Sequence, residues 1–145
     1  MPCLLAKFDK PSHNKARNKY NVGTVSTDIF HFNVQSAKHT CCQVFIHHDS
    51  GCVYVYPMKK KSDAPRALTS FLQDISKDST SKIKCLRSDG AKEFQSTEFT
   101  GILGRHTIGQ EIGLRHDHQS NGNAERCIRN IAKITRAILI DSGFS

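Results

Sequence analysis

The sequence predicts one mixed α/β domain, in which helices cover the faces of a single β-sheet. Three β-rich runs come first, and helical and strand-like patterns then alternate toward the C-terminus. A length of 145 residues suits a single core. A content of 37% hydrophobic and 23% charged residues is typical of a globular protein.

The first three predicted strands form an antiparallel meander. Residues 24–32 alternate in the manner of a half-buried strand, and Asp28 lies near its middle. Residues 40–47 and 52–58 are rich in β-branched and aromatic side chains, and a turn signal at 49–51 joins them. Short connections of this kind favour antiparallel neighbours.

The later elements are predicted from apolar periodicity and from capping residues. Ser62 is expected to cap a helix that runs to about Ile75, with Pro65 near its start. Its apolar stripe consists of Ala67, Leu68, Phe71, Leu72 and Ile75. The remaining expected elements are a strand at 82–87 ending at Asp89, a short helix at 97–103, a strand at 107–112, a loop at 113–121 and a long helix at 122–140.

A net charge of +8 and a pI near 9.3 favour a polyanionic partner such as nucleic acid, although charge that only confers solubility is the alternative. Residues 1–20 are expected to form a basic extended arm, either a solvated tail or a DNA-backbone contact. The first twenty residues lack the apolar run of a signal peptide, and no stretch is long enough to span a membrane. We therefore expect an intracellular protein with no membrane partner.

In that compartment the cysteines are expected to be reduced. Their spacings match no zinc template, so they are interpreted as core or surface thiols. The five concerned are Cys41, Cys42, Cys52, Cys85 and Cys127.

Three acids are candidate metal ligands: Asp28 in a strand, Asp89 at a strand end, and Glu125 early in the long helix. Magnesium prefers carboxylate oxygens, and two ions about 4 Å apart can activate the attacking oxygen and stabilise the leaving oxygen in phosphoryl transfer. Singly, each acid would be an ordinary strand, turn or helix-dipole residue. Arg129, Lys133 and Arg136 follow Glu125 along one helix face and form either a phosphate-binding ridge or a solvated face.

The strings around these acids resemble the integrase catalytic core of copia-type LTR retrotransposons, a branch of the retroviral integrase family. The matching motifs are Arg87-Ser88-Asp89 with Glu93-Phe94, and Asn121-Gly122 with Ala124-Glu125-Arg126. The 35 residues between Asp89 and Glu125 match the usual gap of that family, and Asp28 after Ser26-Thr27 matches its first acid. The resemblance covers about residues 20–143.

The resemblance implies an RNase H-like fold with a mixed five-stranded sheet. It implies a three-acid (DDE) site in which Asp28, Asp89 and Glu125 hold Mg²⁺ or Mn²⁺. The implied reactions trim the DNA ends of the element and join them to target DNA in the nucleus. By position, Gln119 and Asn121 lie in a DNA-contacting loop, and Arg129 stands where relatives have a DNA-contacting lysine. A homo-oligomer is implied for the full-length protein.

The resemblance also divides the chain into two parts. Residues 1–20 resemble the end of an upstream zinc-binding region, with Cys3 as its last ligand, so no zinc is expected here. Residues 21–145 correspond to the catalytic core, which is expected to be incomplete at its C-terminal helices. Two alternatives remain open: an inactive nucleic-acid-binding remnant of a transposable element, and an RNase H-type nuclease.

Overall fold

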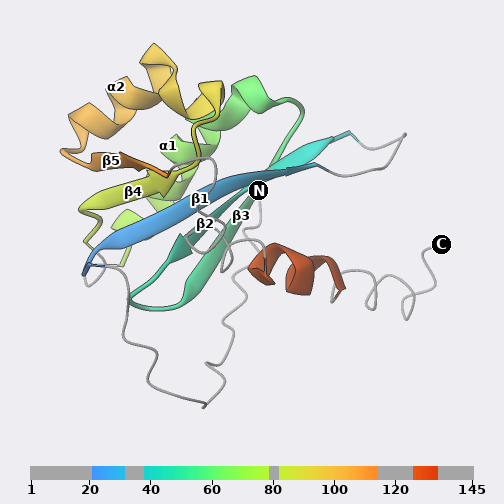
Figure 1. Cartoon of the computed structure of the whole chain (residues 1–145), viewed down its shortest axis with the longest axis horizontal. Coiled ribbons are helices and arrows are strands. Elements are labelled where there is room, and N and C mark those ends of the chain that lie inside the picture. The colour runs from blue at the N-terminus through green and yellow to red at the C-terminus, as the bar shows by residue number, and fades with distance from the viewer. Residues whose placement is uncertain (1–20, 32–37, 79–81, 114–125, 134–145) are drawn as a thin grey trace.

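The computed structural model describes residues 21–31, 38–78, 82–113 and 126–133, and these contain one five-stranded sheet (Figure 1). The strands are β1 (Thr24–His31), β2 (Cys41–His47), β3 (Cys52–Met58), β4 (Cys85–Ser88) and β5 (Gly109–Ile112), in the spatial order β3-β2-β1-β4-β5. β1, β2 and β3 pair antiparallel, whereas β4 pairs parallel with β1 and β5 parallel with β4. The predicted mixed sheet with its meander is therefore confirmed.

The start of β4 differs from the prediction and has a clear physical cause. The carbonyl of Gly23 accepts the N–H groups of Lys84 (2.9 Å) and Cys85 (3.2 Å), so the ladder between β1 and β4 begins at this level rather than at residue 82. Gly23 has a φ of +83°, and a Cβ there would lie 2.9 Å from the carbonyl oxygen of Lys82. Only glycine allows so close an approach of the two chains.

One face of the sheet, here called the first face, packs against α1 (Ala64–Ser76) and α2 (Thr97–Arg105) (Figure 1). Phe45 of β2 stacks on Phe71 of α1 with ring centroids 4.2 Å apart, and Tyr54 meets Phe71 edge-on. The whole predicted apolar stripe of α1 is buried. This apolar contact fixes the helix to the sheet.

The opposite face, here called the second face, carries a smaller apolar cluster. Cys42, Val44 and Ile46 of β2 and Val53 of β3 pack against Ile128. Ile128 belongs to the helical segment 126–133, which lies within the predicted long helix. The helix that follows Glu125 in the chain therefore covers the second face beside β1, β2 and β3 (Figure 1).

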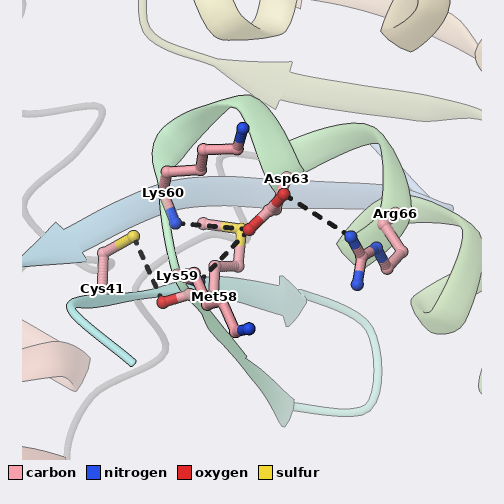
Figure 2. Close-up of polar contacts among 6 residues, drawn as sticks. All are labelled: Cys41, Met58, Lys59, Lys60, Asp63 and Arg66. Atoms are coloured by element: carbon pink, nitrogen blue, oxygen red, sulfur yellow. Dashed lines mark hydrogen bonds and ion pairs between the residues drawn. The ribbon is translucent and has the colours of Figure 1, made fainter. Parts of the chain in front are cut away.

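The junction between β3 and α1 corrects the predicted cap (Figure 2). A short 3₁₀ turn, Lys61–Asp63, precedes α1, and Asp63 rather than Ser62 is the residue at the helix start. Asp63 Oδ2 accepts the backbone N–H groups of Lys59 (3.2 Å) and Lys60 (3.3 Å), and Oδ1 lies 3.6 Å from the Arg66 guanidinium. The carboxylate thus satisfies the N–H groups of the turn, which a serine one position earlier does not do here.

A second 3₁₀ turn, Lys92–Gln95, was not expected from the sequence. Phe94 is its buried residue and meets Phe99 of α2 edge-on at 5.4 Å. Gln110 of β5 donates its side-chain N–H to the carbonyl of Phe94 at 2.6 Å. These contacts fix the chain directly after Asp89 to the first face.

The five cysteines named above all carry free thiols, as predicted. Cys41 and Cys42 are both buried and point to opposite faces of β2. Within the described segments, every helix is too short or too polar to cross a bilayer.

Candidate metal and nucleic-acid site

Asp28 projects from β1 onto the second face of the sheet. Its antiparallel partner is Val44, which belongs to the apolar cluster of that face, and directly paired residues share a face. Asp28 is half-buried, and its Oδ1 accepts the N–H of Ile29 at 2.8 Å. The carboxylate is therefore anchored on the sheet and lies beside the helix that covers this face.

Asp89 directly follows the last residue of β4 and is also half-buried. Its Oδ1 accepts the N–H of Ala91 at 3.1 Å, a local turn that orients the carboxylate. The preceding carbonyl, that of Ser88, accepts the N–H of Gly113 at 2.8 Å. The hydrogen bonds from Ala91 and Gly113 together hold the end of β4 in place.

The register of the parallel strands brings the two acids to the same level. Thr24 pairs with Cys85, Val25 with Leu86 and Ser26 with Arg87, a constant offset of 61 residues. Asp28 and Asp89 differ by the same 61 positions, so they lie opposite each other just beyond the last pair. Neighbouring strands are about 4.8 Å apart, and residues paired in register point to the same face of a sheet. The side chains of Asp28 and Asp89 therefore point to the same face.

Glu125 lies outside the described residues, as do Gln119, Asn121 and Arg136. The described segment that follows Glu125 begins at residue 126 and is helical, with Ile128 buried against the second face. Arg129 and Lys133 are exposed on that helix. The structure thus positions the side chains of Asp28 and Asp89 on the second face, and segment 126–133 packs against the same face.

The oxygen donors of this acid pair fit a hard divalent cation. Two anchored, half-buried carboxylates on adjacent strands are the ligand type that Mg²⁺ and Mn²⁺ take, and the pair contains no soft sulfur or imidazole ligand. Among the described residues, no group of three or more His, Cys, Asp or Glu side chains could hold a metal ion. Glu125, the third acid predicted from the sequence, lies outside the described ranges.

The surroundings of the acid pair are partly dry. Burial, with smaller contributions from Cys41 and Asp28, raises the pKa of the Cys42 thiol to about 12. Ser26 Oγ lies 2.7 Å from His48 Nε2, and burial lowers the pKa of that histidine to about 4. Arg87, paired in register with Ser26, lies 3.7 Å from Glu111.

Sequence reasoning missed four polar residues that form hydrogen-bonded pairs near the acids. Ser26 and His48 pair on the second face, and Gln43 pairs with Thr27 on the first. The sequence signal for these residues was a polar side chain inside a β-rich run. That signal does not predict which strands become neighbours or which side chains form a hydrogen bond.

Two hollows on the described surface lie away from the acids. One of about 380 Å³ lies at the C-terminal end of β3 and the start of α1. Basic Lys59, Lys60 and Arg66 border it, together with Tyr56 and Met58. Among the described residues, the acid pair lies on the open second face of the two inner strands β1 and β4.

The chain resembles known proteins in both sequence and structure, although no family model matches it. Over 95 residues it is 33% identical to the "Retrovirus-related Pol polyprotein from transposon TNT 1-94" of Nicotiana tabacum. That match covers 66% of the chain, and the chain spans only 7% of the length of the polyprotein.

Similar solved structures are retroviral integrases. The HTLV-2 integrase catalytic core domain in complex with magnesium gives a TM-score of 0.68 in its trimeric form and 0.67 in its dimeric form, each at 23% identity. These matches cover 89% and 88% of the chain and 79% of each core domain. A simian T-cell lymphotropic virus intasome in complex with PP2A regulatory subunit B56 gamma gives 0.72 at 19% identity, over 86% of the chain and 43% of that protein. The chain therefore has the fold of retroviral integrase catalytic cores and is related in sequence to a retrotransposon Pol polyprotein.

Proposed function

We propose that the chain is the catalytic core of a retrotransposon integrase, which trims the 3′ ends of element DNA and joins them to target DNA. The observation that carries this proposal is the level placement of Asp28 and Asp89 on one face of β1 and β4, beside the helix that follows Glu125. The sequence kinship with a Pol polyprotein supports the same reading.

In this proposal Asp28, Asp89 and Glu125 hold two Mg²⁺ or Mn²⁺ ions. The bound ions would lower the pKa of the attacking water or 3′-hydroxyl and stabilise the leaving oxygen. The chain itself contributes position: the N–H groups of Ile29 and Ala91 anchor the two aspartates. Anchored carboxylates need little rearrangement when ions and DNA arrive.

We further propose that DNA approaches over the exposed side of the helix that carries Glu125. Arg129 and Lys133 are exposed there, one helical turn apart. Arg136, Gln119 and Asn121 are proposed as further DNA contacts by their positions in the sequence. Phosphates bound along this helix would bring a scissile phosphodiester to the acid pair.

The assembly is also part of the proposal. Residues 1–20 would be the end of an upstream region and residues 21–145 the catalytic core. The HTLV-2 cores are described in dimeric and trimeric forms, and we propose a homo-oligomer for the full-length protein, acting on chromosomal DNA in the nucleus.

The direct test is a magnesium titration of the chain followed by ¹H–¹⁵N NMR. The amide signals of Asp28 and Asp89 are expected to shift together, and Asp89→Asn is expected to abolish the shift because it removes an anionic ligand. Glu98→Gln is the matched control, because Glu98 is an exposed carboxylate on α2 at the other face. An absence of shifts at both aspartates in the wild type would contradict the proposal.

Joining of a labelled DNA end by the chain, with Mn²⁺ supplied, tests the reaction itself. Strand transfer that Asp89→Asn abolishes is the expected result. DNA binding without transfer would favour an inactive remnant, and cleavage of an RNA–DNA hybrid without joining would favour a nuclease.

A further inference from the structure

Three polar side chains are buried on the first face, directly behind the acid pair. Thr27 precedes Asp28, Ser88 precedes Asp89, and Gln43 lies on the neighbouring strand β2. Their exposed fractions are 2%, 2% and 0%. Because successive side chains of a strand alternate between faces, the three point into the α1/α2 core while the acids point the other way.

These side chains follow one line across three strands. Gln43 Nε2 donates to Thr27 Oγ1 at 2.9 Å. Gln43 is paired with Ile29, so it reaches Thr27 diagonally across the β1–β2 ladder. Ser88 stands at the same 61-residue offset from Thr27 that relates β1 to β4. Gln43, Thr27 and Ser88 therefore lie in a row on the first face, and the two aspartates lie on the opposite face at the same level of the sheet.

Stability alone does not account for these residues. Among the described residues, Gln43 Oε1 and Ser88 Oγ are buried without a hydrogen-bond partner. Each such atom loses its bonds to water and regains none, which is unfavourable. An apolar side chain of similar shape would suit this core better.

We infer that Gln43 and Thr27 are positioning residues for the acid pair, because their hydrogen bond fixes the β1 backbone where Asp28 projects. Side chains that orient metal ligands commonly matter for affinity although they do not touch the ion. The Gln43–Thr27 bond ties β1 to β2 one residue before Asp28. The inference rests on the proposed function, because it concerns metal binding by Asp28 and Asp89.

The test replaces the polar pair by apolar groups of similar shape, as Thr27→Val and Gln43→Met, singly and together. The double variant is expected to keep or raise its urea midpoint, because it removes an unsatisfied buried oxygen. Its affinity for Mg²⁺, measured from the NMR shifts at Asp28 and Asp89, is expected to fall by about ten-fold. Thr27→Ser keeps the hydroxyl acceptor and is expected to keep the wild-type affinity.

His47→Leu is the matched control. His47 is equally buried on the same face of β2, its Nε2 also lacks a partner among the described residues, and it pairs with Val25, away from the acids. It is expected to leave Mg²⁺ affinity unchanged. An unchanged affinity in the double variant, with the wild type binding Mg²⁺, would overturn the inference and leave the proposed function standing. Equal losses in the double variant and His47→Leu would also overturn it. A wild type that binds no Mg²⁺ would contradict both this inference and the proposed function.

Discussion

At the residue scale, His48 carries the clearest pH dependence of the described part of the chain. The ring is partly buried at the end of β2, and its Nε2 lies 2.7 Å from Ser26 Oγ. Burial is the largest cause of its lowered pKa, and the neighbouring His47 adds to it. The pKa is about 4 in the folded chain against an ordinary value of 6.5.

The folded chain is therefore expected to lose stability as the pH falls from 6.5 to about 4. In that window the unfolded chain binds a proton that the folded chain does not, so unfolding is favoured. After discounting for partial exposure, the loss is about 1 to 2 kcal/mol. Urea unfolding across this window measures it. His48→Gln is expected to flatten the dependence, and an NMR titration of His48 with a midpoint near 6.5 would contradict it.

At the element scale, the end of α2 has an unusual residue in a regular helix stop. Ile108 N–H donates to the carbonyl of Leu103 at 3.0 Å, and Thr107 N–H donates to that of Gly104 at 3.1 Å. This is the Schellman pattern, and its left-handed position belongs to Thr107, with a φ of 55°. A β-branched residue is strained in that conformation, where glycine is favoured.

Thr107→Gly is accordingly expected to stabilise the fold by about 1 kcal/mol, because relief of strain exceeds the added freedom of the unfolded chain. Thr107 is exposed, so the substitution removes no core packing. Chemical denaturation measures the change. Thr107→Ala keeps the Cβ and hence the strain, so it serves as the control. An equal gain in Thr107→Ala would show that the backbone conformation is not the cause.

The elements also show how far sequence reasoning reaches. Period-two alternation predicted β1, and β-branched and aromatic content predicted β2 and β3, each to within a residue. The stripe of α1 was correct because burial of one helix face dictates its spacing. The cap at α1 was wrong, since Ser62 and Asp63 are both good capping residues and only the folded turn selects between them.

The site was predictable only in part for a similar reason. The motifs around Asp28 and Asp89 predicted these acids as metal ligands, which remains a proposal, and the register of β1 and β4 places the two at the same level. The bond between Gln43 and Thr27 could not be foreseen, because it depends on which residues of two strands become neighbours, and alternation alone does not fix that register.

At the scale of the whole molecule, the two faces of the sheet differ in role. The first face holds the larger apolar core under α1 and α2, whereas the second carries Asp28 and the smaller cluster under segment 126–133. The net charge of +8 would attract a nucleic acid to the acids most strongly if basic side chains lie beside the second face. Arg129 and Lys133, exposed on segment 126–133, are among the described residues that satisfy this condition.

Replacing Arg129 and Lys133 together by glutamine is expected to weaken DNA binding and to reduce the slope of log K against log salt by about 1.8, because each lost phosphate contact releases about 0.9 fewer counterions. Fluorescence anisotropy with one duplex at several salt concentrations measures the slope. Arg66→Gln with Lys77→Gln is the control: it removes the same charge from the two ends of α1, where the side chains are 82% and 76% exposed. If both pairs lower the slope equally, DNA is attracted by net charge alone, and the helix beside the acid pair is not its track.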